Sequence, residues 1–360
     1  MHQEFSVPVH IFALDGNVIH IRPFGQGHIN RTYRAETDTG ALYLFQRVNT
    51  HVFPNFVGLM ENIRLVTEHV REKVVAEGGD PLRECMTLVP TKTGENFACL
   101  EDGCWRCDLF IPNTVALQTV RDPRDFYLAA RAFGKFQQQL RDFPARKLCD
   151  VIPNFHNTPR RLDALWSAVA EDAVGRVKDV QPELDFIRAR KGLCHVLQDA
   201  LDRGELPLTV THNDTKLNNL LFDENTMEPV AVVDLDTVMP GSSLFDFGDS
   251  IRAGAATAEE DEIDLSKVGC SMELYEAFVK GWAETCGMSQ KEKELLPLAA
   301  QVLTLECGIR FLTDYLQGDT YFATSRVHHN LDRCRTQLKM VWDMEQKEET
   351  IRSIVKKYCK

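Results

Sequence analysis

The sequence predicts an α+β fold with two lobes, a strand-rich lobe over residues 1–110 and a mainly helical lobe over residues 111–360. Three observations predict this fold class. Runs of β-forming residues, separated by turn residues, dominate the first lobe. Apolar residues at helical spacing dominate the second lobe. Short strand-like runs interrupt those helices over residues 208–236, which indicates a small additional sheet.

The first lobe is expected to contain strands around one helix. Residues 18–48 carry three β-rich runs, separated by turns at Gly25–Gly27 and Asp38–Gly40. Residues 54–76 carry apolar side chains at helical spacing. Residues 85–111 return to a strand-like pattern. Together these patterns predict a small antiparallel sheet accompanied by a single helix.

The second lobe is expected to be helical on both sides of its short strands. LTVTH, NLLF and VAVVDLD are the predicted strands, and a turn at Asp223–Pro229 joins the last two. The expected helices span residues 122–143, 158–202, 271–285, 290–317 and 328–357.

Composition excludes several classes of protein. The chain has 41 basic and 53 acidic residues and a formal net charge of −12, which argues against a nucleic-acid partner. It has no run of about 18 apolar residues, so we expect no membrane span. Its N-terminus lacks the basic and apolar regions of a signal peptide, so we expect a cytoplasmic protein.

Eleven cysteines are scattered without the spacing of a disulfide framework, which indicates reduced thiols. Cys85, Cys99, Cys104 and Cys107 form a local cluster that contains one C-x-x-C pair. Structural zinc sites usually use two such pairs. We therefore expect small, buried hydrophobic side chains here rather than a zinc site.

The most informative segment runs from His212 to Asp236. It contains H-x-D-x-x-x-x-N, followed by a hydrophobic strand that ends in D-x-D. Phosphoryl transfer to a hydroxyl needs a carboxylate that orients the hydroxyl and accepts its proton, and oxygen ligands that hold Mg²⁺ on the phosphates. Asp214 is predicted for the first task, and Asn219 and Asp234 are predicted for the second.

Three neighbouring residues receive less direct roles. Strand alternation would aim Asp236 to the same face as Asp234, as a further metal or substrate contact, unless the strand has already ended. His212 is expected to hold the loop by hydrogen bonds rather than to act as an acid or base. Lys216 either contacts the γ-phosphate or remains a solvated surface residue.

A literal D-F-G occurs at Asp246-Phe247-Gly248, but it comes well after the strand that ends at Asp234. We therefore do not interpret it as a metal-binding motif of kinases. Asp246 and Asp249 are expected to cap and brace the loop and helix around them.

A glycine-rich turn between the first two strands is the candidate nucleotide loop. Gly25 and Gly27 would let the backbone approach phosphates closely. A plain hairpin turn is the alternative. The Walker A pattern is absent, so a P-loop fold is not expected.

Longer blocks resemble one known family. They are THNDTKLNNLLFD, AVVDLDTVMPGSSLFDFGDSIR and LECGIRFLTDYLQGDTYFAT, with GQGHIN near the start and FHNTP at residues 155–159. They are similar to the N-acetylhexosamine 1-kinases, a branch of the aminoglycoside phosphotransferase and choline kinase superfamily, over nearly the whole chain. The resemblance implies a protein-kinase-like (aminoglycoside phosphotransferase-like) fold. It also implies transfer of phosphate from ATP, with Mg²⁺, to the anomeric hydroxyl of N-acetylglucosamine or N-acetylgalactosamine.

The resemblance implies further contacts outside the central segment. Arg310 and Tyr321 would bind sugar hydroxyls, with ordinary helix packing as the alternative. His28 would reach the sugar from the first lobe. The adenine would lie near Leu109 and Ile111, held by backbone groups.

The third predicted strand departs from many kinases, which place a lysine there against the α- and β-phosphates. This strand reads YLFQR and has no lysine. Gln46 or Arg47 is therefore expected to contact the phosphates instead.

Two other functions stay open at this point. One is a kinase of the same fold that acts on homoserine, choline, methylthioribose or an aminoglycoside, and the other is a nucleotide-binding pseudokinase. The expected partners are ATP and a small-molecule sugar, and the protein is expected to be a monomer or a homodimer.

Overall fold

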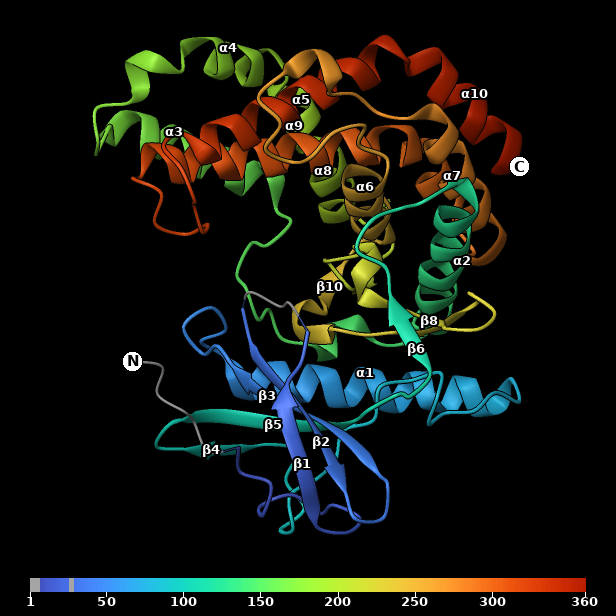
Figure 1. Cartoon of the computed structure of the whole chain (residues 1–360). Helices are drawn as coiled ribbons and strands as arrows, with labels where there is room; N and C mark the ends of the chain where they lie inside the picture. The colour runs from blue at the N-terminus through green and yellow to red at the C-terminus, as the bar shows by residue number, and fades with distance from the viewer. Residues whose placement is uncertain (1–6, 26–28) are drawn as a thin grey trace. The chain divides into compact units, whose positions relative to one another are not determined.

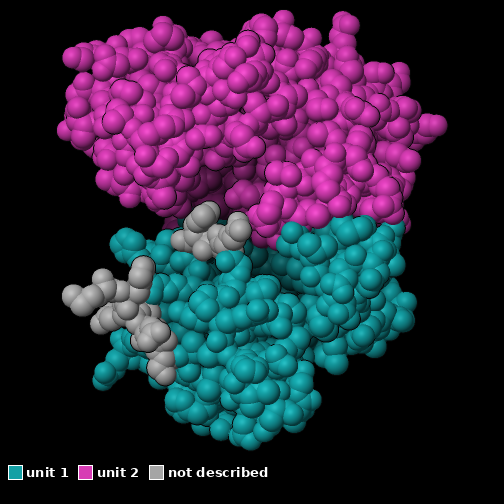
Figure 2. All heavy atoms as spheres, in the orientation of Figure 1, with its two compact units in different colours: residues 1–116, 142–152, 220–239 teal, residues 117–141, 153–219, 240–360 magenta. Residues whose placement is uncertain are grey.

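The computed structural model describes residues 7–25 and 29–360, and its contacts group the chain into two compact units (Figure 2). Unit 1 consists of Met1–Ala116, Asp142–Ile152 and Leu220–Met239, and unit 2 consists of Leu117–Arg141, Pro153–Asn219 and Pro240–Lys360. This grouping adds two later segments to the N-terminal part of the chain. The predicted lobe division between residues 110 and 111 is a different one and stays a prediction.

Unit 1 contains a five-stranded antiparallel sheet with the order β1-β2-β3-β5-β4 (Figure 1). Residues 85–97, expected to be strand-like, contribute only isolated bridges, such as Leu88 opposite Asp108. The three runs predicted within residues 18–48 are confirmed as β1, β2 and β3. The strands are β1 (Val18–Pro23), β2 (Arg31–Thr37), β3 (Leu42–Val48), β4 (Ala98–Leu100) and β5 (Gly103–Leu109).

The two faces of this sheet have opposite chemistry. In the β3–β5 register, Phe45 lies opposite Cys107 and Gln46 lies opposite Arg106. Side chains alternate between faces along a strand. Phe45, Cys107 and Trp105 therefore join the apolar core of this unit, whereas Gln46 and Arg106 lie on the other face.

Helix α1 (Phe56–Ala76) confirms the helix predicted at residues 54–76. Its buried Asn62 connects three parts of unit 1. The Asn62 amide nitrogen donates to the carbonyl oxygens of Cys149 at 2.8 Å and Val238 at 2.9 Å. Its amide oxygen accepts from the Cys149 N–H at 2.9 Å. One side chain thus ties both later segments of the unit to α1.

The strands predicted over residues 208–236 are confirmed, although each is short. In unit 1, β8 (Leu220–Asp223) forms a hairpin with β9 (Pro229–Val232), and β6 (Thr114–Ala116) pairs with the other edge of β8. The third predicted strand, β7 (Thr209–Thr211), pairs with β10 (Met239–Gly241), in which the chain passes from unit 1 to unit 2.

Unit 2 contains the helices that follow α1 (Figure 1). The helix predicted over residues 158–202 is divided into three, and the left-handed Asp172 (φ 40°) ends the first of them. Helix α8 packs against α3, α6 and α9. The helices are α2 (Pro123–Gln139), α3 (Thr158–Glu171), α4 (Gln181–Ala189), α5 (Lys191–Asp202), α6 (Ser243–Gly254), α7 (Met272–Thr285), α8 (Gln290–Leu316), α9 (His329–Gln346) and α10 (Glu348–Tyr358).

Helix α8 is the one described helix that is long and apolar enough, by length and composition, to cross a membrane. However, 83% of its most apolar 18-residue window is buried inside the protein. Its side chains contribute to the apolar core that α3, α4, α5 and α9 also line. This burial is typical of the central helix of a folded domain.

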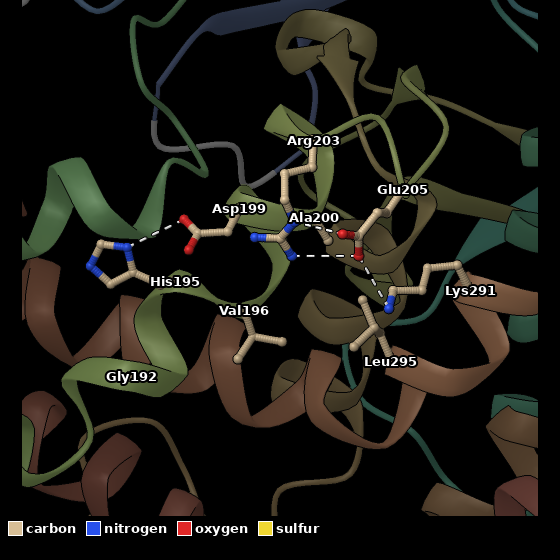
Figure 3. A pocket seen from close by; sticks show the side chains of 9 residues that line it. All are labelled: Gly192, His195, Val196, Asp199, Ala200, Arg203, Glu205, Lys291 and Leu295. Atoms are coloured by element: carbon tan, nitrogen blue, oxygen red, sulfur yellow. Dashed lines mark hydrogen bonds and ion pairs between the residues drawn. The ribbon is translucent and has the colours of Figure 1, made fainter.

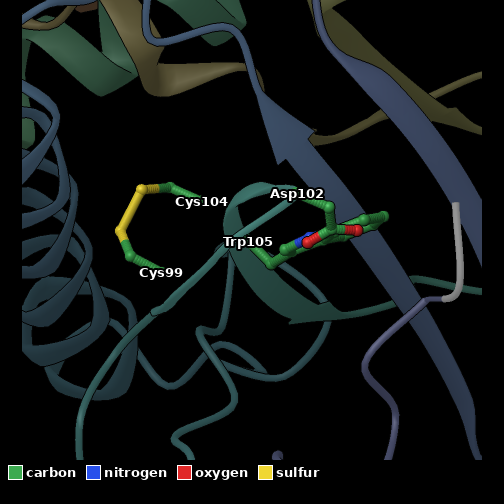
Figure 4. The surroundings of a disulfide bond; sticks show 4 residues. All are labelled: Cys99, Asp102, Cys104 and Trp105. Carbon is green, nitrogen blue, oxygen red and sulfur yellow. A yellow bond between two sulfur atoms is a disulfide. The ribbon is translucent and has the colours of Figure 1, made fainter.

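The expectation that all cysteines are reduced thiols is wrong for one pair. Cys99 and Cys104 form a disulfide across the β4–β5 hairpin (Figure 4). They lie directly opposite each other in the strand register, with Cα atoms 4.0 Å apart, so their side chains meet. Cys85 and Cys107, from the same cluster, are free and buried, as expected of small hydrophobic side chains.

Candidate active site

The loop after β7 carries Asp214, the predicted base. Asn213 has φ 66°, a left-handed conformation that asparagine tolerates better than most residues, so the chain turns sharply there. The Lys216 ammonium lies 3.0 Å from Asp214 Oδ1, and the Asn219 amide nitrogen donates to Asp214 Oδ2 at 3.1 Å. Three of the predicted residues, Asp214, Lys216 and Asn219, are thus brought together within unit 2.

Lys216 is both charged and accessible. The charge of Asp214, opposed by burial, raises the pKa of Lys216 above its ordinary value. Its side chain is 49% exposed. The loop therefore presents a cation directly beside the predicted base.

Asp246, at the start of α6, holds this loop through a buried carboxylate. It accepts hydrogen bonds from the backbone N–H groups of His212 at 2.9 Å and Asn213 at 2.8 Å. The Gln137 side-chain amide also donates to it at 2.6 Å. Burial raises the pKa of Asp246, while the nearby imidazole of His212 and these backbone donors favour its ionised form.

Asp249, one turn later on α6, holds the next part of the loop. It accepts from the Thr215 N–H at 3.2 Å and forms an ion pair with Arg252 at 2.8 Å. The predicted bracing role of Asp246 and Asp249 is therefore confirmed. The predicted capping role is not, because the helix is capped by Ser242, whose hydroxyl accepts from the Leu244 N–H.

The structural role predicted for His212 is also confirmed. The residue is fully buried, and its ring lies edge-on to Phe133 and Phe136, with centroids 6.1 Å from each. Its Nδ1 accepts from the Asp214 N–H at 3.3 Å. His212 thus supports Asp214, the predicted base.

A second brace of the loop comes from the FHNTP block, to which sequence reasoning gave no role. His156 Nε2 lies 3.3 Å from the Asn213 carbonyl oxygen, and its Nδ1 lies 2.7 Å from Glu306 Oε1. Thr158 donates to the other oxygen of Glu306 at 2.6 Å. Burial acts to raise the pKa of Glu306, but His156 and Thr158 hold it below its usual value. The sequence signal for this contact was Glu306 itself, a charged residue within the otherwise apolar helical pattern of residues 290–317.

Unit 1 carries the D-x-D residues, and their geometry differs from the one predicted. Strand β9 ends at Val232, and Asp234 adopts a left-handed conformation with φ 60°. Asp236 lies in a short 3₁₀ turn over Leu235–Thr237. The strand has therefore ended before Asp234, which was the stated alternative, and the alternation argument for a shared face of Asp234 and Asp236 does not apply.

Asp236 is held inside unit 1 by a network that sequence reasoning missed. Its Oδ2 accepts from the Asn30 amide at 2.6 Å, and its Oδ1 accepts from the Arg106 guanidinium. Arg106 is 0% exposed. It also donates through Nε and Nη2 to Gln46 Oε1, at 2.8 and 2.5 Å. The signal in the sequence was the alternation of WRCD in β5, which puts Arg106 and Asp108 on one face.

Asp108 is the second carboxylate beside Arg106, with 3.6 Å between Asp108 Oδ2 and Arg106 Nε. Neither of its buried oxygens accepts a hydrogen bond among the described residues. Burial raises the pKa of Asp108 to about 6, against the lowering effect of Arg106. This network places one guanidinium between two buried carboxylates.

The residues predicted for the nucleotide are described in part. Gly25 has φ 78°, a conformation that favours glycine in a turn. Gly27 and His28 lie outside the described residues. The Leu109 N–H donates to the Thr87 carbonyl at 2.9 Å, and the Ile111 carbonyl accepts from Thr114 at 2.8 Å.

Gln46 uses both ends of its amide within the β-sheet. Besides accepting from Arg106, it donates to Thr32 Oγ1 at 3.1 Å. Its predicted contact with phosphates stays a prediction, as do those of the glycine loop and of Leu109 and Ile111.

Two of the residues predicted for the sugar, Arg310 and Tyr321, lie in unit 2. The Arg310 guanidinium stacks on Phe155, 5.0 Å from the ring centroid, and on Phe322 at 5.6 Å. The Tyr321 ring is 60% exposed and lies 4.8 Å from the Phe322 ring. Asp314 accepts from the Tyr321 N–H at 2.8 Å, so the loop that carries the tyrosine is held by α8.

A separate hollow of about 250 Å³ lies on α5 (Figure 3). Its charges pair with one another, since Glu205 binds Arg203 at 2.6 Å and Lys291 at 3.2 Å. None of the predicted site residues lines it, and we assign it no part in the chemistry. Its lining residues are Gly192, His195, Val196, Asp199, Ala200, Arg203, Glu205, Lys291 and Leu295.

Known structures share this fold. An aminoglycoside phosphotransferase from Alicyclobacillus acidocaldarius is similar with a TM-score of 0.63 at 13% identity, over 99% of this chain and 98% of that chain. A microcompartment-associated aminopropanol kinase is similar with a TM-score of 0.60 at 13% identity, over 96% of each chain. An amicoumacin kinase in complex with AMP-PNP, Ca²⁺ and Ami is similar with a TM-score of 0.56 at 11% identity, over 94% of this chain and 91% of that chain.

These similarities confirm the predicted α+β, protein-kinase-like fold class. Sequence comparison extends the result from fold to family. Residues 20–283 match APH, the phosphotransferase enzyme family, over most of the chain. The chain therefore belongs to the APH family of phosphotransferase enzymes.

Proposed function

We propose that this phosphotransferase moves the γ-phosphoryl group of ATP to the anomeric hydroxyl of N-acetylglucosamine or N-acetylgalactosamine. The observation that carries the proposal is the loop at Asp214, which places a carboxylate, an ammonium and an amide within about one hydrogen-bond length. The blocks that resemble the N-acetylhexosamine 1-kinase branch support the choice of acceptor. The similar amicoumacin kinase, in complex with AMP-PNP, supports ATP as the donor.

In this reaction Asp214 accepts the proton of the acceptor hydroxyl as its oxygen bonds to the γ-phosphorus. The bond from that phosphorus to the bridging oxygen breaks, and ADP leaves with the electron pair. Lys216, 3.0 Å from Asp214, offers positive charge to the group in transfer. Asp246 and His156 keep the loop in position for both residues.

Asn219 and Asp234 are proposed to hold Mg²⁺. The donor set fits a hard cation, because both side chains offer oxygen ligands. The Asn219 amide nitrogen faces Asp214, so its amide oxygen is turned away from the base. In the sequence, Asn219 comes directly before β8 and Asp234 comes two residues after β9. Mg²⁺ bound there would neutralise phosphate charge during transfer.

Asp236 is proposed to act mainly as a positioning residue, which holds the side chains of Arg106 and Asn30 in place. Both of its oxygens already accept hydrogen bonds, from Arg106 and Asn30. A carboxylate oxygen has two lone pairs, so the predicted contact of Asp236 with the metal or the sugar would use the second pair of each.

The remaining contacts are proposed from the family resemblance. Arg310 and Tyr321, with His28, would bind the sugar. The glycine turn at Gly25 and Gly27 and the side chain of Gln46 would approach the phosphates. Leu109 and Ile111 would line the adenine site.

The test is ADP release with ATP and Mg²⁺ against N-acetylglucosamine, N-acetylgalactosamine, glucose, galactose, homoserine, choline and kanamycin. Phosphorus NMR then identifies the phosphorylated position. We expect turnover of the two N-acetylhexosamines and an anomeric phosphate. Turnover of another member of the panel would discard the sugar assignment, and ATP binding without any turnover would favour a pseudokinase.

Two variants test the assigned roles. Asp214→Asn is expected to abolish turnover while ATP binding is kept, because only the proton acceptor is lost. Asp234→Ala is expected to lose the Mg²⁺-dependent part of nucleotide affinity. A near-normal rate for Asp214→Asn would show that Asp214 is not the base.

A further inference from the structure

The peptide unit between Asn213 and Asp214 is held between two histidine rings. Its carbonyl oxygen lies 3.3 Å from His156 Nε2, and its N–H donates to His212 Nδ1 at 3.3 Å. The C=O and N–H groups of a trans peptide point in opposite directions, so the two rings hold it from opposite sides. These contacts therefore determine the orientation of the peptide that leads into the proposed base.

The hydrogen-bond partners assign different protonation states to the two rings. His212 Nδ1 accepts from a backbone N–H, so it carries no proton and the ring is neutral. Each nitrogen of His156 faces an oxygen, with Nδ1 2.7 Å from Glu306 Oε1 and Nε2 3.3 Å from the Asn213 carbonyl oxygen. A neutral imidazole has a single N–H, whereas an imidazolium has two. With Glu306 ionised, His156 makes both hydrogen bonds only in its charged form.

Glu306 supplies the opposite charge. It is 1% exposed, and the Thr158 hydroxyl donates to its second oxygen at 2.6 Å. Burial acts to raise the pKa of Glu306, but the charge and hydrogen bond of His156 and the hydroxyl of Thr158 hold it below its usual value. The charge of Arg310 acts in the same direction. A buried carboxylate is costly without a cation beside it, so Glu306 stabilises the protonated form of His156.

Other charges near the ring do not replace this contact. Asp246 and Asp249 interact with the charge of His156, but their oxygens hold backbone N–H groups of the loop. In the part of the chain that the structure describes, Glu306 is the carboxylate that the ring contacts directly. The charged groups around this pair include Arg310 on α8, Arg161 on α3, Asp246, Asp249 and Arg252 on α6, and Lys216 on the loop.

We propose that His156 is a positioning residue for the transfer reaction, and that its imidazolium, held by Glu306, fixes the peptide that leads into Asp214. This inference rests on the proposed function, because the peptide matters through Asp214 as the base. Loss of the Nε2 proton would leave a ring nitrogen and a carbonyl oxygen facing each other, both of them acceptors, so the peptide would be free to turn. The charged form is present at low pH and lost as the pH rises, so kcat is expected to fall toward alkaline pH.

The first measurement needs no turnover. Nitrogen NMR of protein labelled with ¹⁵N-histidine counts the protons on each imidazole ring, and the signals of His156 are identified by their absence from His156→Gln. At neutral pH we expect two protons on the His156 ring and one on the His212 ring. Glu306→Gln is expected to leave His156 with one proton, because the glutamine oxygen still accepts from Nδ1 but no charge stabilises the second proton.

The second measurement is kcat with N-acetylglucosamine and saturating Mg·ATP as a function of pH. In Glu306→Gln, the alkaline fall of kcat is expected at a pH roughly 1–3 units lower, because the opposite charge is lost. His156→Leu removes the donor and is expected to lower kcat roughly ten- to hundred-fold, because the base is displaced. His156→Gln offers an amide N–H that does not titrate, so it is expected to recover most of this loss and to lack the alkaline fall. The KM for ATP should stay unchanged in all three variants.

His195→Gln is the matched control. The His195 ring also lies beside a carboxylate, 3.4 Å from Asp199 Oδ1, but it is 44% exposed on α5. This variant is expected to keep the kcat and the pH profile of the unchanged protein. Equal changes of the pH profile in His195→Gln and His156→Gln would contradict a specific role of His156.

Two further results would overturn the proposal. One is a single proton on the His156 ring of the unchanged protein at neutral pH. The other is an alkaline fall of kcat that Glu306→Gln does not move and His156→Gln does not remove. A doubly protonated His156 in a protein that phosphorylates no N-acetylhexosamine would instead contradict the proposed function, because the NMR measurement is independent of turnover.

Discussion

Removal of the Asp246 carboxylate tests whether α6 holds the loop that carries Asp214, the proposed base. The carboxylate accepts from the N–H groups of His212 and Asn213 and from the side chain of Gln137, and all of these residues are buried. Asp246→Ala removes the side-chain acceptor of two buried backbone N–H groups and of one N–H of Gln137, whose amide nitrogen still donates to the Val210 carbonyl oxygen at 3.0 Å. Each buried, unsatisfied donor costs about 1–3 kcal/mol, and the loop can relax in part. We therefore expect the free energy of unfolding to fall by about 4 kcal/mol.

Asp246→Asn is the graded version of the same change. It keeps the shape of the side chain and one carbonyl oxygen, but it turns an NH₂ group toward a former donor. We expect a smaller loss, about 2 kcal/mol. Asp163→Ala is the control, because its carboxylate is 69% exposed and its ion pair is worth less than about 1 kcal/mol.

The assay combines denaturant unfolding with kinetics at varied Mg²⁺. Both Asp246 variants are expected to lower kcat, because Asp214, the proposed base, is less well positioned, and to leave the Mg²⁺ concentration for half-maximal rate unchanged. If Asp246→Ala kept its stability and instead required more Mg²⁺, Asp246 would be a metal ligand. The D-F-G interpretation rejected above would then be correct.

Three further predictions concern unit 1. Arg106→Met is expected to lower the free energy of unfolding by about 3–5 kcal/mol, because it leaves two buried carboxylates without their cation. Arg106→Met with Asp236→Asn is expected to lose less than the sum of the two single changes, and strict additivity in denaturant unfolding would contradict the ion pair. The Asp108 pKa is raised from 3.8 to about 6, so the folded protein keeps this proton to higher pH than the unfolded chain does. Protonated Asp108 contributes about 3 kcal/mol to the free energy of unfolding, which is present below pH 4 and lost as the pH rises through 6. Asp108→Asn should remove this decrease in the free energy of unfolding between pH 4 and 6. Thiol titration of the unfolded, unreduced protein should find nine free thiols, and a count of eleven would exclude the Cys99–Cys104 bond. Dithiothreitol should lower the free energy of unfolding by about 2 kcal/mol, given the short loop that the disulfide closes.

The features that the sequence predicted correctly are those that local patterns determine. Strands β1 to β3 follow from β-rich runs between glycine turns, and α1 follows from apolar residues at helical spacing. The contacts of Asp214 with Lys216 and Asn219 are also local, because all three lie on one short loop. Local signals of this kind need no knowledge of how distant segments pack.

The features that the sequence did not predict depend on distant partners. Arg106 binds Asp236, which lies 130 residues later, and His156 binds Glu306, which lies 150 residues later. Each of these residues alone is compatible with an exposed position. The failed alternation argument for Asp236 has a different origin, because nothing in VAVVDLD marks where the strand ends and the left-handed Asp234 begins.

The residues that hold the loop of Asp214 and the residue that holds Asp236 support different proposed functions. Kinetic measurements can therefore distinguish these two sets of contacts. Asp246 and His156 contact the backbone beside the proposed base, within unit 2. Arg106 contacts Asp236, two residues from a proposed metal ligand, within unit 1. Loss of the first set should therefore reduce kcat at saturating Mg·ATP, because proton transfer is impaired. Loss of the second should first raise the Mg²⁺ and ATP concentrations that the enzyme needs. Identical kinetic defects in both sets would show that the braces support the fold rather than the individual proposed roles.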